Sequence, residues 1–100
     1  MAMTYDNALQ AAERHIRERI SASDFLARHK FGAVGLRSEN NRFWTFVSGS
    51  DELFEQGIVP GAVYACVDKM DGHIWTEDEI EQFYLQKEAA RQAQTDLVAA

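Results

Sequence analysis

The sequence predicts a small α+β domain: an antiparallel sheet of three to four strands with an N-terminal and a C-terminal helix, in the order α-β-β-β-β-α. Two observations predict this class. Near the N-terminus, apolar residues recur at three- and four-residue spacing, as they do on one side of a helix. The middle of the chain carries short β-branched and aromatic runs separated by turn residues, which is typical of strands. With 100 residues, 46% of them apolar, we expect a single domain over residues 1–100.

The first helix is predicted to run from Thr4 to about Ile20. Its apolar stripe consists of Ala8, Leu9, Ala12, Ile16 and Ile20. The next stretch, residues 21–30, has Phe25 and Leu26 as apolar anchors. It is either the end of the first helix or a second short helix, and the sequence leaves both alternatives open.

Residues 31–37 and 42–48 are predicted to be two strands, because a turn-rich Ser-Glu-Asn-Asn segment separates them. In the second strand, Trp44 and Phe46 face one way while Phe43 faces the other. Bulky apolar groups on both sides are typical of a central strand that is covered on each face.

A single helical turn is expected next, capped by Ser50 or Asp51 and ended by Gly57. A turn at Pro60-Gly61 is then predicted, because proline presets one backbone angle and glycine accepts a positive φ. It leads into a third strand, residues 62–68.

Residues 64–75 have the acidic residues and the Asp-Gly pair of a calcium-binding loop. If Gly72 takes the sixth position of such a loop, Val67 and Lys69 take the first and third positions, where oxygen ligands are required. The metal interpretation therefore fails, and we expect no metal and no cofactor. The pair Asp71-Gly72 instead predicts the turn of a β-hairpin.

The returning strand, residues 73–75, is expected to pair with residues 66–68 as a short fourth strand. Because side chains alternate along a strand, the hairpin residues divide between two faces. One face receives Val63, Ala65, Val67 and Ile74, and the other receives Tyr64, Cys66, Asp68, His73 and Trp75.

The last helix is predicted to run from Thr76 to about Gln94. Thr76 and Glu79 have the spacing of a capping box, and Trp75 and Ile80 have that of a hydrophobic staple. From Lys87 the stretch Lys-Glu-Ala-Ala-Arg-Gln-Ala-Gln keeps a high helix propensity but contains no large apolar residue. We therefore expect the last turns to project past the body, where they fray or meet another chain.

Acidic residues gather in the middle of the chain: residues 39–81 contain ten acidic and two basic side chains, a net charge of −8 within a total of −6. Such an excess repels nucleic-acid phosphates and attracts a basic partner. We expect a loop and a hairpin tip to carry partner-binding acids. These candidates are Asp51, Glu52, Glu55 and Asp71. The alternative is a solvated surface that serves only solubility.

No apolar run approaches the roughly 18 residues that a membrane span needs, and no leader segment is visible, so we expect a cytoplasmic protein without a membrane partner. The single cysteine, Cys66, excludes an internal disulfide and a cysteine-rich zinc site. Inside an apolar strand it is expected to be a packing residue. The chain contains neither a phosphate-binding loop nor a readable Ser-His-Asp set. We therefore expect no catalytic residue and no enzyme.

Three features occur together in this chain: Ala8 with Ala12, the strand segment Trp44-Thr45-Phe46, and Val67-Asp68-Lys69 with Asp71-Gly72. In this combination the chain resembles the YrhB-like immunity-protein family, small bacterial proteins associated with polymorphic toxin systems. The resemblance implies a non-enzymatic protein that binds a cognate toxin or another client polypeptide.

The sequence leaves three functions open. The first is a cytoplasmic bacterial protein-binding domain of the immunity or chaperone type, which uses its acidic surface to bind a basic partner. The second is a small ligand-binding domain or enzyme with a pocket near Cys66, His73 and Trp75. The third is a structural domain that forms a homo-oligomer, such as a homodimer, through the C-terminal helix.

Overall fold

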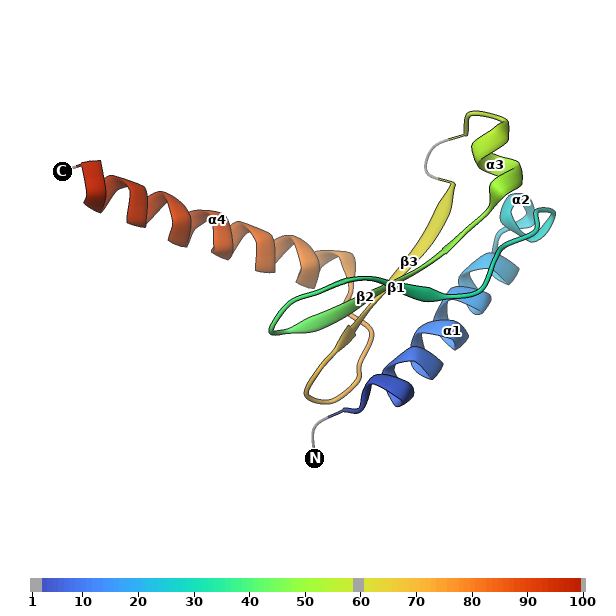
Figure 1. Ribbon diagram of the computed structural model, residues 1–100, viewed down its shortest axis with the longest axis horizontal. Coiled ribbons are helices and arrows are strands. Elements are labelled where there is room, and N and C mark those ends of the chain that lie inside the picture. Colours follow the sequence, from blue (N-terminus) through green and yellow to red (C-terminus); the bar gives the residue numbers. More distant parts are fainter. Residues whose placement is uncertain (1–2, 59–60, 100) are drawn as a thin grey trace.

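The computed structural model describes residues 3–58 and 61–99, and the side chains of residues 3–58 and 61–93. In this part of the chain the elements are α1 (Tyr5–Ala22), α2 (Asp24–Ala27), β1 (Gly35–Glu39), β2 (Phe43–Gly49), α3 (Asp51–Glu55), β3 (Ala62–Asp68) and α4 (Glu77–Ala99) (Figure 1). The predicted α+β class, with a helix at each end, is confirmed. The predicted turn at Pro60 falls outside the described residues.

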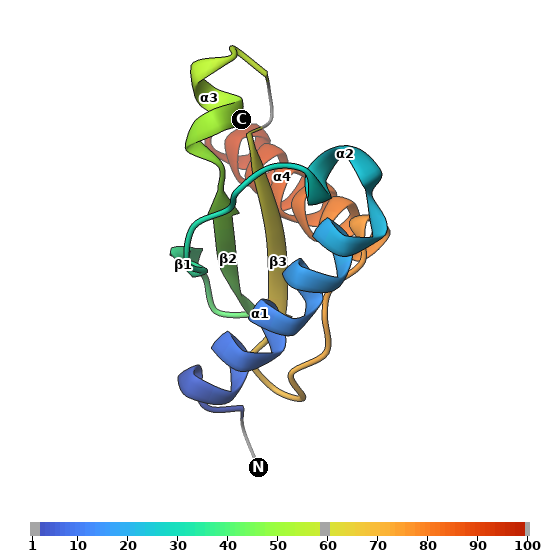
Figure 2. The ribbon, with the colours of Figure 1, turned by 90° about the vertical axis from the view of Figure 1, so that its right-hand side faces the viewer.

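The sheet is antiparallel with the order β1-β2-β3, so β2 is the central strand, as its two apolar faces predicted. Helix α1 lies against one face, and α4 leaves the body on the opposite side (Figures 1 and 2). The expected fourth strand is instead a single β-bridge between Val67 and Ile74. It is no longer than this because the Thr76 cap begins a helix two residues after the bridge. Chain order is therefore α-α-β-β-α-β-α over the described residues, rather than α-β-β-β-β-α.

The first strand begins later than predicted, at Gly35 rather than at residue 31, and each of its residues is exposed. The stretch before it is attached to the end of β2 by separate contacts. The Gly32 N–H donates to the Gly49 carbonyl at 2.9 Å, and the Ser48 hydroxyl donates to the Gly32 carbonyl at 2.7 Å. Phe31 packs against the core from this irregular segment. The apolar side chain of Phe31 is therefore explained by its packing against the core and not by membership of a strand.

The main core lies between α1 and one face of the sheet. Ala8, Ala12 and Ile16 of the predicted stripe are buried, while Leu9 and Ile20 pack at its margin. Against them lie the buried side chains of Phe46, Val63, Ala65 and Val67. Alanine at two of the three central helix positions lets the helix axis approach the sheet closely. Thr4 caps the helix by accepting the Asn7 N–H, 3.2 Å away.

A second, smaller core lies on the other face of the sheet, where Phe43, Cys66 and Trp75 are buried together. Ile80 and Phe83, from the first turns of α4, pack against this cluster. The predicted division of the hairpin is confirmed at the buried positions, since Val63, Ala65 and Val67 lie in the core on the α1 side and Cys66 and Trp75 lie in the core on the α4 side. The partly buried Ile74 packs on the α1 side, as predicted.

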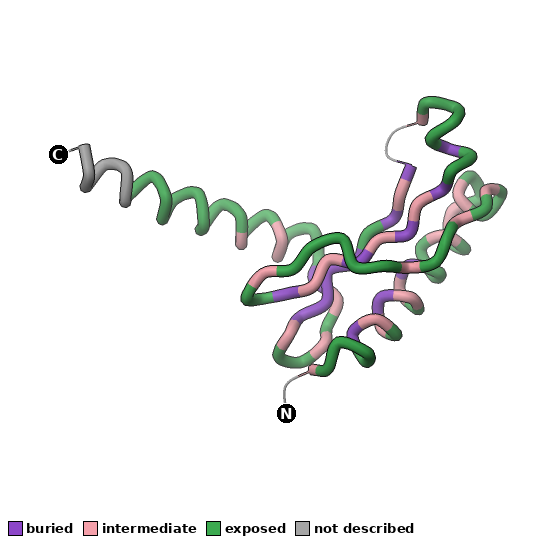
Figure 3. The backbone as a smooth tube through the Cα atoms, in the orientation of Figure 1, coloured by how far each residue is buried: buried purple, intermediate pink, exposed green. Residues whose placement is uncertain are grey.

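Helix α4 projects away from the sheet after these first turns, and its described side chains beyond Phe83 are exposed (Figure 3). Tyr84 and Leu85 are 52% and 55% exposed. The radius of gyration is 16.5 Å, whereas a compact chain of this length has about 13 Å. The expected projection of the helix is therefore confirmed, and the helix continues past Gln94 to Ala99. Across the described residues, the helices are too short or too polar to span a bilayer.

Two short helices complete the fold. Residues 24–27 form the separate helix α2, which Ser23 caps by accepting the Leu26 N–H. Of the two alternatives for this region, the second helix is therefore correct. The predicted helical turn is α3, and its cap is Ser50, not Asp51. Gly57 follows it with φ +72°, which only glycine adopts without strain.

Candidate functional site at the hairpin and the start of α4

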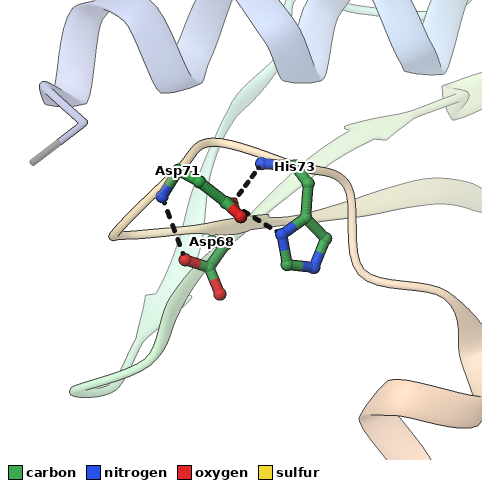
Figure 4. Close-up of side chains that lie close together, drawn as sticks. All are labelled: Asp68, Asp71 and His73. Carbon is green, nitrogen blue, oxygen red and sulfur yellow. Dashed lines mark hydrogen bonds and ion pairs between the residues drawn. The ribbon is translucent and has the colours of Figure 1, made fainter.

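Asp68 organises the hairpin that follows β3. Its side chain accepts the backbone N–H groups of Met70, at 2.7 Å, and of Asp71, at 3.2 Å (Figure 4). Gly72, with φ +76°, closes the loop by donating its N–H to the Asp68 carbonyl at 3.0 Å. The positive φ expected for the Asp71-Gly72 turn is thus found at Gly72.

The same carboxylate joins this loop to the second core. Asp68 is 7% exposed, and its other oxygen accepts the indole N–H of Trp75 at 2.8 Å. Burial alone would raise the pKa of Asp68, but the indole and the two backbone N–H donors outweigh it and lower the pKa overall. The buried group is therefore a carboxylate that holds Trp75 in one orientation.

His73 connects the hairpin loop to α4. Its Nδ1 lies 2.6 Å from an Asp71 oxygen and its Nε2 lies 2.9 Å from a Glu79 oxygen. Glu79 also forms the predicted capping box, since it accepts the Thr76 N–H at 3.0 Å and donates its own N–H to the Thr76 hydroxyl at 3.2 Å. The hydrogen bonds to Glu79 and then to Asp71 raise the pKa of His73. The side chain is 42% exposed, so solvent screens both ion pairs.

A groove with a volume of about 360 Å³ lies between this hairpin and α4. Its lining includes the carboxylates of Asp68, Asp78 and Glu79, the ring of His73, and the aromatic side chains of Trp75 and Phe83. Arg42, the residue before β2, also lines the groove. Its guanidinium carbon lies 5.4 Å from the centre of the Trp75 ring. The groove thus has aromatic and acidic walls and already holds one guanidinium.

Among the residues whose side chains the structure describes, Asp68, Asp71 and His73 come closest to a metal-binding arrangement, because one ligand atom of each lies within 4.8 Å of the others. Their atoms already have other partners. Asp68 accepts the loop and indole N–H groups, and Asp71 accepts both the backbone N–H and the ring nitrogen of His73. The turn accounts for this arrangement, and we assign no metal to it.

The pocket that the sequence placed near Cys66, His73 and Trp75 is not one cavity. Cys66 lines a separate space of about 280 Å³ between β3, α1 and the start of α4, whereas His73 lines the groove. Trp75 lies between the two. The Cys66 sulfur contacts the Thr45 hydroxyl at 3.5 Å, and burial raises the pKa of the thiol. A reactive thiolate is therefore disfavoured at this position.

The four acids predicted to bind a partner are exposed, but they do not form one patch. Asp51, Glu52 and Glu55 lie on α3, beyond the end of the sheet where Gly49 pairs with Ala62. Asp71 lies beyond the opposite end, where Phe43 pairs with Asp68. Besides Asp68, the acids that line the groove next to this hairpin are Glu79 and Asp78. Sequence reasoning assigned them only to the start of a helix, and it did not connect Arg42 with the groove.

Replacing Asp68 with asparagine is expected to destabilise the fold by about 1–3 kcal/mol near neutral pH, because one amide nitrogen then faces N–H donors. Asp68 has a lowered pKa in the folded state. Its stabilisation is therefore present above the unfolded-state value of about 3.9 and is lost as the pH falls through the folded-state pKa. Urea unfolding at a series of pH values measures the free energy of unfolding of both proteins. The difference in this free energy between wild type and variant should shrink below about pH 4. A difference that stays constant would contradict this role.

The resemblance to immunity proteins rests on the sequence features given above and remains a prediction. Searches of this chain against protein-family models, curated proteins and solved structures find no match.

Proposed function

We propose that this protein is a small polypeptide-binding domain that captures a basic side chain of its partner in the groove between the hairpin and α4. The observation that carries the proposal is the position of Arg42. A guanidinium of the chain itself lies over Trp75, in a groove whose rim includes Asp78 and Glu79. A partner's arginine or lysine would meet the same chemistry along the rest of the groove.

The energetics favour a basic side chain over other ligands. A cation over an aromatic ring gains about 0.5–2 kcal/mol, and more when water is excluded. Exposed carboxylates add a smaller, salt-dependent attraction. The volume of about 360 Å³ is near the lower end of ligand pockets, which span about 300–1,000 Å³. It suits a side chain better than a large cofactor.

This proposal keeps the class that the sequence predicted, a non-enzymatic cytoplasmic protein of the immunity or chaperone type. The resemblance to the YrhB-like family supports the type, and the net charge of −8 over residues 39–81 supports a basic partner. Asp51, Glu52 and Glu55 lie at the far end of the sheet. There they would steer a basic partner during encounter rather than contact the same side chain.

A second candidate is a homodimer formed through α4, which the sequence also left open. The observation that favours it is that Tyr84 and Leu85 are more than half exposed on a helix that leaves the body. The enzyme alternative would need Cys66 and His73 to face one cavity. Among the described residues they line different cavities, so no contact favours this alternative.

The proposal is tested with Nα-acetyl-arginine methylamide as the probe and its neutral isostere, Nα-acetyl-citrulline methylamide, as the ligand control. We expect the arginine probe to shift the NMR signal of the Trp75 indole N–H in a saturable way, because Trp75 and the Asp68 carboxylate that accepts this N–H both line the groove. The citrulline compound should cause a much smaller shift, since it has the shape of arginine without the charge.

Three variants locate the site. Asp78→Asn should weaken binding of the arginine probe, whereas Asp51→Asn, the same change on α3, should leave it unaltered. Arg42→Ala should strengthen binding, because it removes a competing cation from the Trp75 ring. If the arginine and citrulline probes bind alike, or if Asp78→Asn and Asp51→Asn have equal effects, the groove is not a site for basic side chains.

A further inference from the structure

His73 contacts a carboxylate with each of its ring nitrogens, at 2.6 Å to Asp71 and 2.9 Å to Glu79. A neutral imidazole carries one N–H and can donate only one of these hydrogen bonds. The charged imidazolium donates both. The geometry at His73 is therefore that of a cation held between two acids, one on the hairpin loop and one on α4.

The charged groups around this ring come from each element that packs near it. The end of β3 and the hairpin loop contribute Asp68 and Asp71, and α4 contributes Asp78 and Glu79. Arg42, the residue before β2, lies over the Trp75 ring. The His73 and Trp75 rings are themselves parallel, with an interplanar angle of 2° and centres 6.2 Å apart. When His73 is charged, it and Arg42 offset half of the four carboxylates. When His73 is neutral, Arg42 is the one cation of this set.

We propose that His73 makes the groove sensitive to pH: the imidazolium is an internal cation that competes with a basic side chain of the partner, and its deprotonation frees the carboxylates to bind that side chain. This inference rests on the proposed function and adds its regulation. Binding of a basic partner should therefore strengthen as the pH rises and weaken on acidification.

The direction of the pH dependence follows from thermodynamic linkage between the ligand and the proton. A cationic ligand and the proton on His73 oppose each other, so each lowers the affinity of the protein for the other. The two carboxylates raise the pKa of His73 from its ordinary value of about 6.5, so the ring keeps its proton to a higher pH than a free imidazole does. One unit charge a few ångströms away in water changes affinity by about three- to fivefold.

The experiment measures binding of Nα-acetyl-arginine methylamide by NMR between about pH 5 and about pH 9, a range that brackets the ordinary imidazole pKa. We expect the affinity of the wild-type protein to rise by about three- to fivefold across this range. In His73→Gln the affinity should be nearly independent of pH. His29→Gln changes a histidine on the far side of the fold, bonded to the Phe25 carbonyl, and should keep the wild-type pH dependence.

A second measurement needs no variant. The His73 ring signals are titrated with pH in the absence and in the presence of a saturating concentration of the arginine probe, and we expect the probe to lower the pKa of His73. If the probe binds but its affinity does not change with pH and it does not change the pKa of His73, the proposed pH dependence is wrong while the proposed function stands. If the probe binds at no pH, both are wrong.

Discussion

Replacing Trp75 with alanine is expected to lower the free energy of unfolding by about 3–5 kcal/mol. Trp75 is 7% exposed, and its ring lies 4.6 Å from that of Phe43 and 5.8 Å from that of Phe83, measured between centres. The substitution opens a cavity in the small second core and removes the indole partner of the buried Asp68 carboxylate. It also removes the surface on which the first turns of α4 pack.

Urea unfolding followed by circular dichroism is the measurement. Domains of this size have a total stability of about 5–15 kcal/mol, so this variant should lose a substantial fraction of its total stability. Trp75→Phe keeps an aromatic ring but loses the N–H donor, and its midpoint should lie between those of wild type and Trp75→Ala. Tyr84 directly follows Phe83 on α4 but is 52% exposed. Tyr84→Ala should therefore cost at most about 0.5 kcal/mol. Equal midpoints for Trp75→Ala and Tyr84→Ala would refute the second core.

Replacing Phe46 with alanine should cost a similar amount, about 3–5 kcal/mol, on the other face of the sheet. Phe46 is fully buried at the centre of β2, where it packs against the alanine stripe of α1. The ring of Tyr5 lies 5.7 Å from it, between centres. Because Ala8 and Ala12 have no side chain long enough to fill the space, the cavity would stay open and α1 would lose its main contact with the central strand.

Leu36 provides the matched control. It lies directly opposite Phe46 in the β1–β2 pairing, yet it is 41% exposed because β1 is an edge strand. Leu36→Ala should therefore cost about 1 kcal/mol, in proportion to its smaller buried area. Thermal or urea unfolding of the two variants compares a central and an edge position on the same face. A larger loss for Leu36→Ala than for Phe46→Ala would mean that the main core lies elsewhere.

The sequence by itself predicted the features that depend on neighbours along the chain. The α1 stripe follows from helical spacing, and the two faces of the hairpin follow from strand alternation. The Thr76–Glu79 capping box and the turn at Gly72 involve residues no more than a few positions apart. Backbone geometry fixes such relationships before any tertiary contact forms. The central position of β2 was also predictable, because a strand with bulky apolar groups on both faces must be covered on both.

Prediction from the residue pattern was less accurate where apolar residues pack against the core without belonging to a strand. Phe31 and Val34 precede β1 in an irregular segment and pack against the main core. The short return through Ile74 makes one bridge, because the cap of α4 competes for the residues that a fourth strand would need. Both outcomes depend on which of two local structures gains more from packing, and the residue pattern alone is compatible with either.

Only the tertiary structure decided how the candidate site is assembled. Arg42 precedes β2, Trp75 follows the hairpin, and Asp78 begins α4, so their meeting in one groove depends on strand pairing and on the angle at which α4 leaves the sheet. The length of the sheet likewise separates the acids of α3 from Asp71. The sequence grouped these residues together only because all of them are acidic and expected to be exposed. Charge counts add along the chain, whereas binding depends on distance in space, and that distance is set by packing between residues far apart in sequence.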